Sequence, residues 1–312
     1  MPRFRYCLNA STIRTTPVLQ QISTARAAGY DAIELWHDHL DLHLRNGGTL
    51  ADVRKALDDH GLVVPTTIYL AGWFQPAGPE HDQALTEVRR RLEQSAAVGA
   101  QRAIAGPPPG PADRALGARH YHELLELGKS FGVHPAFEYL GFVEDICRLE
   151  DAIDIVNRSQ HVDATIVIDP FHCVRGGGSI NTISRLDPRQ IAISHFNDSP
   201  ATPPFSQQGD EDRVMPGDGV VDLSGWCQAL TDIGYNSWLS LELFREDLLE
   251  EAERVAKLPL GEREDLRRDE PEARAVVLRV AARAARGVDR ERPMEPGLRR
   301  ELPADLRVAD VA

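Results

Sequence analysis

The chain has 312 residues, 42% of them hydrophobic, which is enough for one large α/β domain with a sizeable core. No run of about 18 apolar residues occurs, and the N-terminal residues lack the apolar core of a signal peptide, so neither a transmembrane helix nor secretion is expected. The formal net charge of −13 disfavours binding to nucleic acid or to an anionic membrane. Four scattered cysteines favour reduced thiols and a cytoplasmic protein.

Short apolar or β-branched runs alternate with longer amphipathic or charged segments. The predicted strands are residues 4–9, 31–36, 62–69, 102–105, 133–138, 165–169, 190–195 and 238–242. The predicted helices are residues 17–28, 50–60, 80–98, 111–131, 148–157, a segment after Ser179, and residues 223–233. This alternation within about 250 residues predicts an α/β fold, a (β/α)₈ TIM barrel. A doubly wound sheet is the alternative, but no Gly-x-Gly-x-x-Gly motif follows the first strand.

The composition changes near residue 250. Residues 250–286 are highly charged and rich in Ala and Arg, and we predict two helical pieces divided near Pro259. The second piece, residues 271–286, carries enough apolar side chains to cover the barrel as its last helix. We assign residues 1–286 to the barrel domain, and residues 287–312, with three prolines and many charges, to a charged C-terminal extension.

Four consecutive predicted strands end in side chains that can bind a metal ion. These side chains are Glu138, Asp169, His195 and Glu242. Catalytic residues of TIM barrels lie at the C-terminal ends of the strands, and neighbouring strands are about 5 Å apart. Three clustered carboxylates would raise one another's pKa unless a cation neutralised them. We therefore predict a site for one divalent ion, and mixed Glu, Asp and His ligation suits Mn²⁺, Co²⁺, Zn²⁺ or Mg²⁺.

Other side chains are expected to face the same mouth. The candidate substrate contacts are Glu34, Trp36, Trp73 and Arg213. Trp73, with its neighbour Phe74, is expected to form an apolar wall, and Arg213 is expected to clamp a substrate oxygen. His172, three positions after Asp169, is a candidate catalytic residue. A purely structural role is the alternative to substrate contact. Glu34 could pair with an Arg, the aromatic rings could pack a loop, and Arg213 could lie at the surface.

Five motifs resemble the xylose-isomerase-like sugar phosphate isomerase/epimerase superfamily, and within it the inosose (2-keto-myo-inositol) isomerases. They are residues 137–139 (Phe-Glu-Tyr), 167–172 (Val-Ile-Asp-Pro-Phe-His), 194–198 (Ser-His-Phe-Asn-Asp), 211–219 (Glu-Asp-Arg-Val-Met-Pro-Gly-Asp-Gly) and 239–244 (Leu-Ser-Leu-Glu-Leu-Phe). The likeness runs from about residue 3 to residue 245. It implies a TIM barrel with one divalent metal held by Glu138, Asp169, His195 and Glu242.

The resemblance also implies an activity: a metal-dependent isomerase or epimerase that acts on a small keto-polyol through a cis-enediolate. Glu138 or Glu242 would remove the α-proton, while His172 and Arg213 would hold substrate oxygens. A homo-oligomer is compatible with this expectation.

Three alternative functions are open. A 3-dehydroshikimate dehydratase would use the same scaffold and metal. An apurinic endonuclease is disfavoured, because residues 71–79 contain no His and residues 212–214 lack an Asp-x-His pair. A non-catalytic subunit is compatible with the long charged tail.

Overall fold

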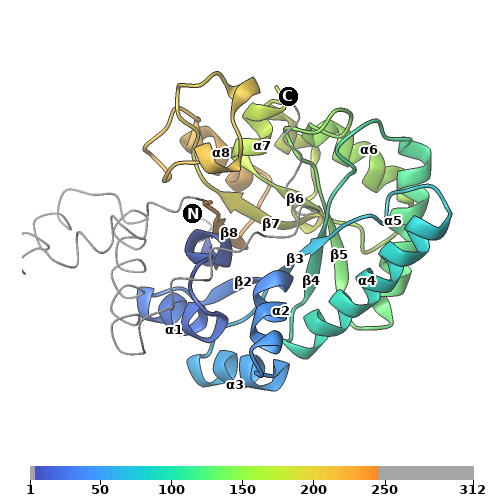
Figure 1. The fold of residues 1–312 in the computed structure, drawn as a ribbon. Coiled ribbons are helices and arrows are strands. Elements are labelled where there is room, and N and C mark those ends of the chain that lie inside the picture. The colour runs from blue at the N-terminus through green and yellow to red at the C-terminus, as the bar shows by residue number, and fades with distance from the viewer. Residues whose placement is uncertain (1–3, 245–312) are drawn as a thin grey trace, which may run out of the picture.

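The computed structural model describes residues 4–244, in which eight parallel strands close into a barrel (Figure 1). The strands are β1 (Arg5–Asn9), β2 (Ala32–Trp36), β3 (Thr66–Leu70), β4 (Arg102–Ala105), β5 (His134–Glu138), β6 (Ile166–Ile168), β7 (Ile191–Phe196) and β8 (Trp238–Leu241). Each strand pairs with its successor in the chain, and β8 pairs with β1. The prediction of a TIM barrel is therefore confirmed.

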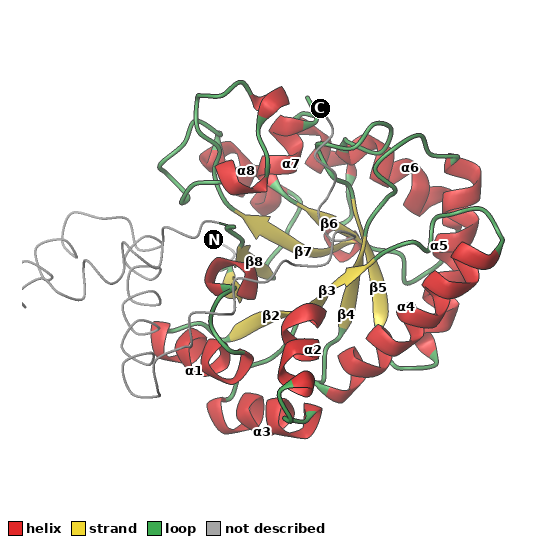
Figure 2. Cartoon of the chain, viewed as in Figure 1, coloured by secondary structure: helices red, strands yellow, loops and turns green. Residues whose placement is uncertain are grey.

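Helices surround the strands on the outside of the barrel (Figure 2). The α-helices are α1 (Val18–Ala28), α2 (His37–Arg45), α3 (Leu50–His60), α4 (Pro79–Ala97), α5 (Arg114–Lys129), α6 (Leu149–Ser159), α7 (Pro170–Arg175) and α8 (Leu223–Asp232). Short 3₁₀ helices are η1 (Ala10–Ile13), η2 (Ile180–Arg185), η3 (Pro188–Gln190), η4 (Phe205–Gln207) and η5 (Asp210–Asp212). Within residues 4–244, none of these helices combines the length and the apolar character needed to cross a bilayer.

Both faces of the strands are buried, which explains why they read as continuous apolar runs. One face fills the barrel with a cluster of mostly small or β-branched side chains, namely Cys7, Ala32, Ile68, Ile104, Ala136, Val167, Ala192, Ile193 and Trp238. The other face packs against the helices in two larger apolar clusters. This filled interior leaves the ends of the strands as the place where polar side chains can gather.

The first and last strands meet at a seam that joins the two ends of the described chain. The guanidinium of Arg5 lies 3.9 Å from the centre of the Trp238 ring, on the neighbouring strand. Thr12 Oγ1 donates to the Leu241 carbonyl (3.0 Å) and accepts from the Leu243 backbone N–H (3.1 Å). The residues that follow β8 are thus held against those that follow β1.

Two helices were not predicted, and one predicted helix has another form. In α2 the leucines Leu40, Leu42 and Leu44 recur at every second position, so the segment has no helical repeat, and only Leu40 and His37 are buried. The six-residue α7 begins at Pro170, directly after its N-cap Asp169. The segment after Ser179 is the 3₁₀ helix η2.

Strand β3 begins four residues later than predicted. Pro65 lies within the predicted range 62–69, and it has no N–H to give to a sheet ladder. Of the residues before it, Val63 forms only an isolated bridge with Ala32, and regular pairing starts at Thr66.

The predicted helices of residues 250–286 and the extension of residues 287–312 lie outside the described residues. The domain boundary at residue 286 therefore stays a prediction.

Candidate metal centre

The four strand-end side chains predicted as metal ligands lie together in the structure. Glu138 ends β5, Asp169 follows β6, His195 lies in β7 and Glu242 follows β8. One possible ligand atom from each lies within 4.8 Å of the others, and all four side chains are buried. His195 Nδ1 is 3.0 Å from Glu242 Oε2, 3.1 Å from Glu138 Oε1 and 3.5 Å from Asp169 Oδ2. Their role as ligands stays a prediction.

The donor set fits a divalent cation. Within residues 4–244, Glu138 Oε1 and His195 Nδ1 are buried but have no hydrogen-bond partner, although buried polar atoms are normally paired. Burial raises the pKa of Glu138 to about 7, since the charges of Glu242 and Asp169 add to the effect of burial while His195 opposes it. A cation among these atoms would give the unpaired atoms a partner and would favour the ionised carboxylates.

Arg213 lies against this cluster and not at the surface. Its Nη1 donates to Asp169 Oδ2 and to Glu242 Oε2 (3.0 Å), and its Nη2 and Nε donate to Asp210 Oδ1 (2.7 and 3.1 Å). The guanidinium carbon also lies 4.5 Å from the centre of the Phe171 ring. Burial alone would lower the pKa of Arg213, but Asp169, Asp210 and Glu242 hold it above its ordinary value. Arg213 therefore keeps its positive charge beside the predicted ligands.

His172 is a neutral side chain that faces Arg213. Burial lowers its pKa to about 4, with Arg213 adding to this effect and Asp169 opposing it. His172 Nδ1 lies 3.2 Å from the Gly141 backbone N–H, which it can accept when the ring proton is on Nε2. Nε2 lies 3.1 Å from Arg213 Nη2, from which it can accept only when the ring proton is on Nδ1. The two contacts of this neutral ring therefore require opposite tautomers.

Glu34 lies next to the predicted ligands, with its Oε2 atom 3.4 Å from His195 Nε2. It is fully buried, and it accepts hydrogen bonds from the hydroxyls of Thr66 and Ser240 and from Asn9 Nδ2 (3.2 Å). Burial would raise the pKa of Glu34, but the charge of His195 and these hydroxyl donors hold it below its ordinary value. The substrate contact of Glu34 stays a prediction, since Glu34 is as fully buried as the predicted ligand Asp169.

Trp36 remains a candidate substrate contact. Its ring is only half-buried, its Nε1 donates to Asn9 Oδ1 (2.7 Å), and it meets the edge of the Phe244 ring at a centroid distance of 5.8 Å.

The predicted apolar wall of Trp73 and Phe74 is corrected. Trp73 is fully buried in the outer apolar cluster, where its ring contacts those of Tyr121 (5.9 Å) and Phe137 (5.8 Å). Phe137 precedes the inward-pointing Glu138, and successive side chains of a strand point to opposite faces. Trp73 therefore packs between the barrel and its helices, because this loop has enough apolar area to join the core.

We expect Trp73→Phe to lower the free energy of unfolding by about 1 kcal/mol, because a smaller ring leaves part of a packed site empty. No hydrogen bond is lost, since Trp73 Nε1 has no partner among residues 4–244. Thermal unfolding and KM, measured on the same preparations, check this expectation. A raised KM at unchanged stability would restore the substrate-wall role.

Two residues at this mouth were missed by sequence reasoning. Asn9 ends β1, and its Nδ2 donates to Glu242 Oε1 (2.8 Å) as well as to Glu34. Tyr69, in β3, packs against the apolar cluster inside the barrel, and its half-buried phenol lies within electrostatic range of Glu138 and Asp210. Asn9 ends β1 and Tyr69 is the residue before the last of β3, but the prediction considered only acidic and His side chains at strand ends, so an Asn and a Tyr were not selected.

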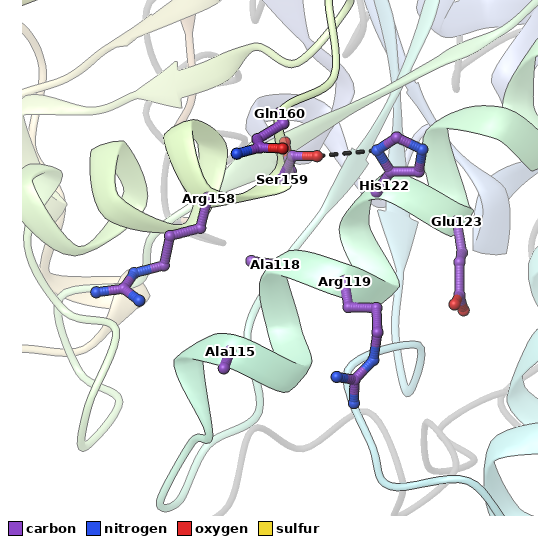
Figure 3. Close-up of a pocket in the computed structure, with 8 residues that line it drawn as sticks. All are labelled: Ala115, Ala118, Arg119, His122, Glu123, Arg158, Ser159 and Gln160. Atoms are coloured by element: carbon purple, nitrogen blue, oxygen red, sulfur yellow. Dashed lines mark hydrogen bonds between the residues drawn. The ribbon is translucent and has the colours of Figure 1, made fainter.

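A second concavity lies on the outside of the barrel, between α5 and α6 (Figure 3). It has a volume of about 470 Å³ and is lined by Ala115, Ala118, Arg119, His122, Glu123, Arg158, Ser159 and Gln160. Its side chains are mostly exposed, and His122 Nδ1 lies 2.8 Å from the Ser159 carbonyl oxygen. The lining lacks a converging set of buried charged groups, so the strand-end cluster is the better candidate for chemistry.

Comparison with known proteins agrees with this fold. Residues 22–270 match the family model described as xylose isomerase-like TIM barrel. The chain belongs to this family. The family match confirms the resemblance drawn from the five sequence motifs.

Two relatives of this xylose isomerase-like barrel are named for an enzyme activity. An inosose isomerase from Bacillus velezensis is 28% identical over 255 residues, which cover 78% of this chain and 89% of the relative. A 3-dehydroshikimate dehydratase from Pseudomonas aeruginosa is 24% identical over 244 residues, but these cover only 36% of that longer protein and 73% of this chain.

A solved structure shows the same fold. It is the structure of IolI protein with a bound zinc atom, and it aligns with a TM-score of 0.74 at 23% identity. The alignment covers 91% of this chain and 97% of IolI protein.

Proposed function

We propose that this chain is a divalent-metal-dependent isomerase or epimerase of an inosose-like keto-polyol. The observation that carries the proposal is the convergence of four buried side chains, from consecutive strand ends, whose ligand atoms lie within 4.8 Å of one another. The inosose isomerases among the relatives and the zinc atom in IolI protein support it.

Glu138, Asp169, Glu242 and the Nδ1 atom of His195 would hold the ion. A bound divalent cation would supply Lewis-acid chemistry, which polarises a carbonyl group and lowers the pKa of the proton on the neighbouring carbon. The donor set is compatible with Mn²⁺, Co²⁺, Zn²⁺ or Mg²⁺.

The two glutamates differ in their surroundings, and this difference suggests separate roles. Glu242 has a donor on each oxygen, since Asn9 Nδ2 donates to Oε1 and Arg213 Nη1 donates to Oε2. Glu138 Oε1 has no donor in the described part of the chain, and burial raises the pKa of Glu138 to about 7. We assign Glu138 as the proton acceptor because no donor among the described residues holds its Oε1 atom, whereas both oxygens of Glu242 accept hydrogen bonds.

The proposed reaction moves one proton between adjacent carbons. Glu138 takes the proton from the carbon beside the ketone, and the electron pair of that C–H bond forms the double bond of a cis-enediolate. A proton is then returned to the neighbouring carbon by Glu242 or by Glu138, while the proton of the substrate hydroxyl passes to the former carbonyl oxygen, so the reaction needs no oxidant or reductant. His172 Nε2–H and Arg213 would donate to the substrate oxygen on which negative charge develops.

The charge around the cluster favours a neutral substrate over an acidic one. The carboxylates at the site are Glu34, Glu138, Asp169, Asp210 and Glu242. Among residues 4–244, Arg213 is the only Lys or Arg that forms an ion pair with any of these carboxylates. The positive charges of Arg213 and of a divalent cation together are fewer than the negative charges of the five ionised carboxylates. An inosose carries no charge, whereas 3-dehydroshikimate carries a carboxylate that this surplus would repel.

The test is a screen of inososes, ketohexoses and 3-dehydroshikimate with the metal-loaded protein in D₂O. We expect turnover of an inosose, with solvent deuterium incorporated at the reacting carbon. An enone or aromatic chromophore from 3-dehydroshikimate, without turnover of any polyol, would replace the isomerase by a dehydratase. A product free of deuterium would argue against the proton-transfer mechanism.

Tyr69 is proposed as the substrate wall in place of Trp73, and Gly106 gives a way to test it. A Cβ atom on Gly106 would lie 1.4 Å from the Tyr69 hydroxyl oxygen, so the phenol fits only because residue 106 has no side chain. We expect Gly106→Ala to displace the phenol and to raise KM about tenfold or more, with metal affinity unchanged.

Gly110→Ala is the matched control for this variant. Gly110 lies in the same loop, and a Cβ atom there meets no other atom within 4 Å. Equal KM values for the Gly106→Ala and Gly110→Ala variants would show that Tyr69 does not contact the substrate.

A further inference from the structure

We propose that Glu34 is a positioning residue, which orients His195 so that Nδ1 faces the metal ion. The proposal rests on the proposed function, since it requires that the strand-end cluster binds a metal. It assigns to a buried carboxylate a task that neither the motifs nor the relatives indicate.

The orientation of the His195 ring is the first observation. Nδ1 is the ring nitrogen that lies among Glu138, Asp169 and Glu242, at 3.0 to 3.5 Å from one oxygen of each. Nε2 lies 3.4 Å from Glu34 Oε2, on another carboxylate, although the contact lacks hydrogen-bond geometry and both ring nitrogens are without a hydrogen-bond partner within residues 4–244. The two nitrogens therefore have different neighbours, and a flipped ring would exchange them.

The second observation is how firmly Glu34 is held. Its Oε1 accepts from the Thr66 hydroxyl of β3, and its Oε2 accepts from the Ser240 hydroxyl of β8 and from Asn9 Nδ2 of β1. Three strands besides its own thus fix one side chain inside the barrel. A buried carboxylate is costly unless it is paired, so these donors allow an ionised group to stay beneath His195.

A carboxylate in this place has a specific effect on a ligand histidine. Histidines that bind metal usually donate their other ring N–H to a carboxylate or carbonyl oxygen, which fixes the tautomer and the ring orientation. With the proton on Nε2, the nitrogen nearer to Glu34, the lone pair of Nδ1 is free to bind a cation. The same carboxylate makes the imidazole a more basic ligand.

A substrate contact is the alternative role, and burial argues against it. Glu34 has no exposed surface, and Asn9, Thr66, Ser240 and His195 already surround its two oxygens.

The test compares metal binding by the full-length wild type with that of Glu34→Gln. The Gln side chain has nearly the same shape but carries no charge, and we expect the affinity for Co²⁺ and Zn²⁺ to fall by about 10- to 100-fold. Chelator competition measures the affinity, and the visible absorption of bound Co²⁺ reports the ligand geometry. Thermal unfolding of the metal-free proteins shows whether both are folded.

Glu150→Gln is the matched control. Glu150 is a part-buried carboxylate of α6 that accepts from the Thr182 hydroxyl, and it is not one of the residues that surround the cluster. Its replacement should leave metal affinity unchanged. Ser240→Ala removes one donor from Glu34 but keeps the carboxylate, so we expect it to weaken metal binding less than Glu34→Gln does; it also serves as the test variant if Glu34→Gln does not fold.

Each outcome has a separate meaning. Wild-type affinity in both Glu34→Gln and Ser240→Ala, or an equal loss in Glu150→Gln, would overturn the positioning role and leave the proposed function intact. Failure of the wild type itself to bind a divalent metal would overturn the proposed function, and the positioning role with it.

Discussion

Replacing Glu138 with Gln is expected to lower kcat about 100-fold or more, which is the usual contribution of a general base to the rate. Gln can still offer an oxygen to a metal ion, but it cannot accept the α-proton. Because Glu138 Oε1 has no donor within residues 4–244, the new amide group disturbs no hydrogen bond of that atom. The variant should therefore keep part of its metal, and turnover, metal content and deuterium exchange check this on one preparation.

Glu242→Gln gives the contrasting case. Asn9 and Arg213 donate to the two oxygens of Glu242. In the Gln variant the amide NH₂ would replace one of these oxygens and would face an N–H group with no acceptor between them. We expect this variant to lose metal as well as turnover. Near-normal kcat in the Glu138→Gln variant would rule out Glu138 as the base, and His172 would then be the first residue to examine.

Asp169→Asn is expected to weaken metal binding by about 100-fold or more, at or beyond the range seen when the partners of metal ligands are changed. Asp169 Oδ1 caps α7 by accepting from the Phe171 N–H (2.7 Å), while Oδ2 accepts from Asn197 Nδ2 (3.2 Å) and from Arg213. An amide NH₂ at the Oδ2 position would face two donors, so the substitution removes a charged ligand and breaks this network.

The metal content of the purified protein, by elemental analysis, measures the effect. Thermal unfolding with and without a chelator gives a second readout, because a metal that binds only the folded state raises the unfolding temperature of the wild type. Full metal content and activity in the Asp169→Asn variant would show that the site was assigned wrongly.

The barrel could be predicted from sequence because its signals are local and repeated. Runs such as residues 165–169 are apolar on both faces, and Gly29 and Gly61 lie where two helices end, with φ angles of 97° and 62°. The start of β3 was missed because an apolar run was given more weight than Pro65. The helix α2 was missed because most of it is not buried, so its apolar residues have no helical repeat.

The candidate site was predictable to a different degree. The position of an acidic or His residue at a strand end is visible in sequence, and this brought four side chains to one place. The depth at which a side chain is buried cannot be read from the sequence, because it depends on which neighbours cover that residue in the fold. The sequence predicts both Glu34 and Trp73 at the mouth. In the structure, donors from three other strands surround Glu34. Trp73 packs against Tyr121 and Phe137.

The seam between β1 and β8 has a consequence for assembly. Glu242 follows the last strand, and it is tied to Asn9, at the end of the first strand, by a 2.8 Å hydrogen bond across 233 positions of sequence. A chain in which the last strand has not yet docked would present Glu138, Asp169 and His195 without Glu242. The set of four predicted ligands would then be complete only after the last strand has closed the ring.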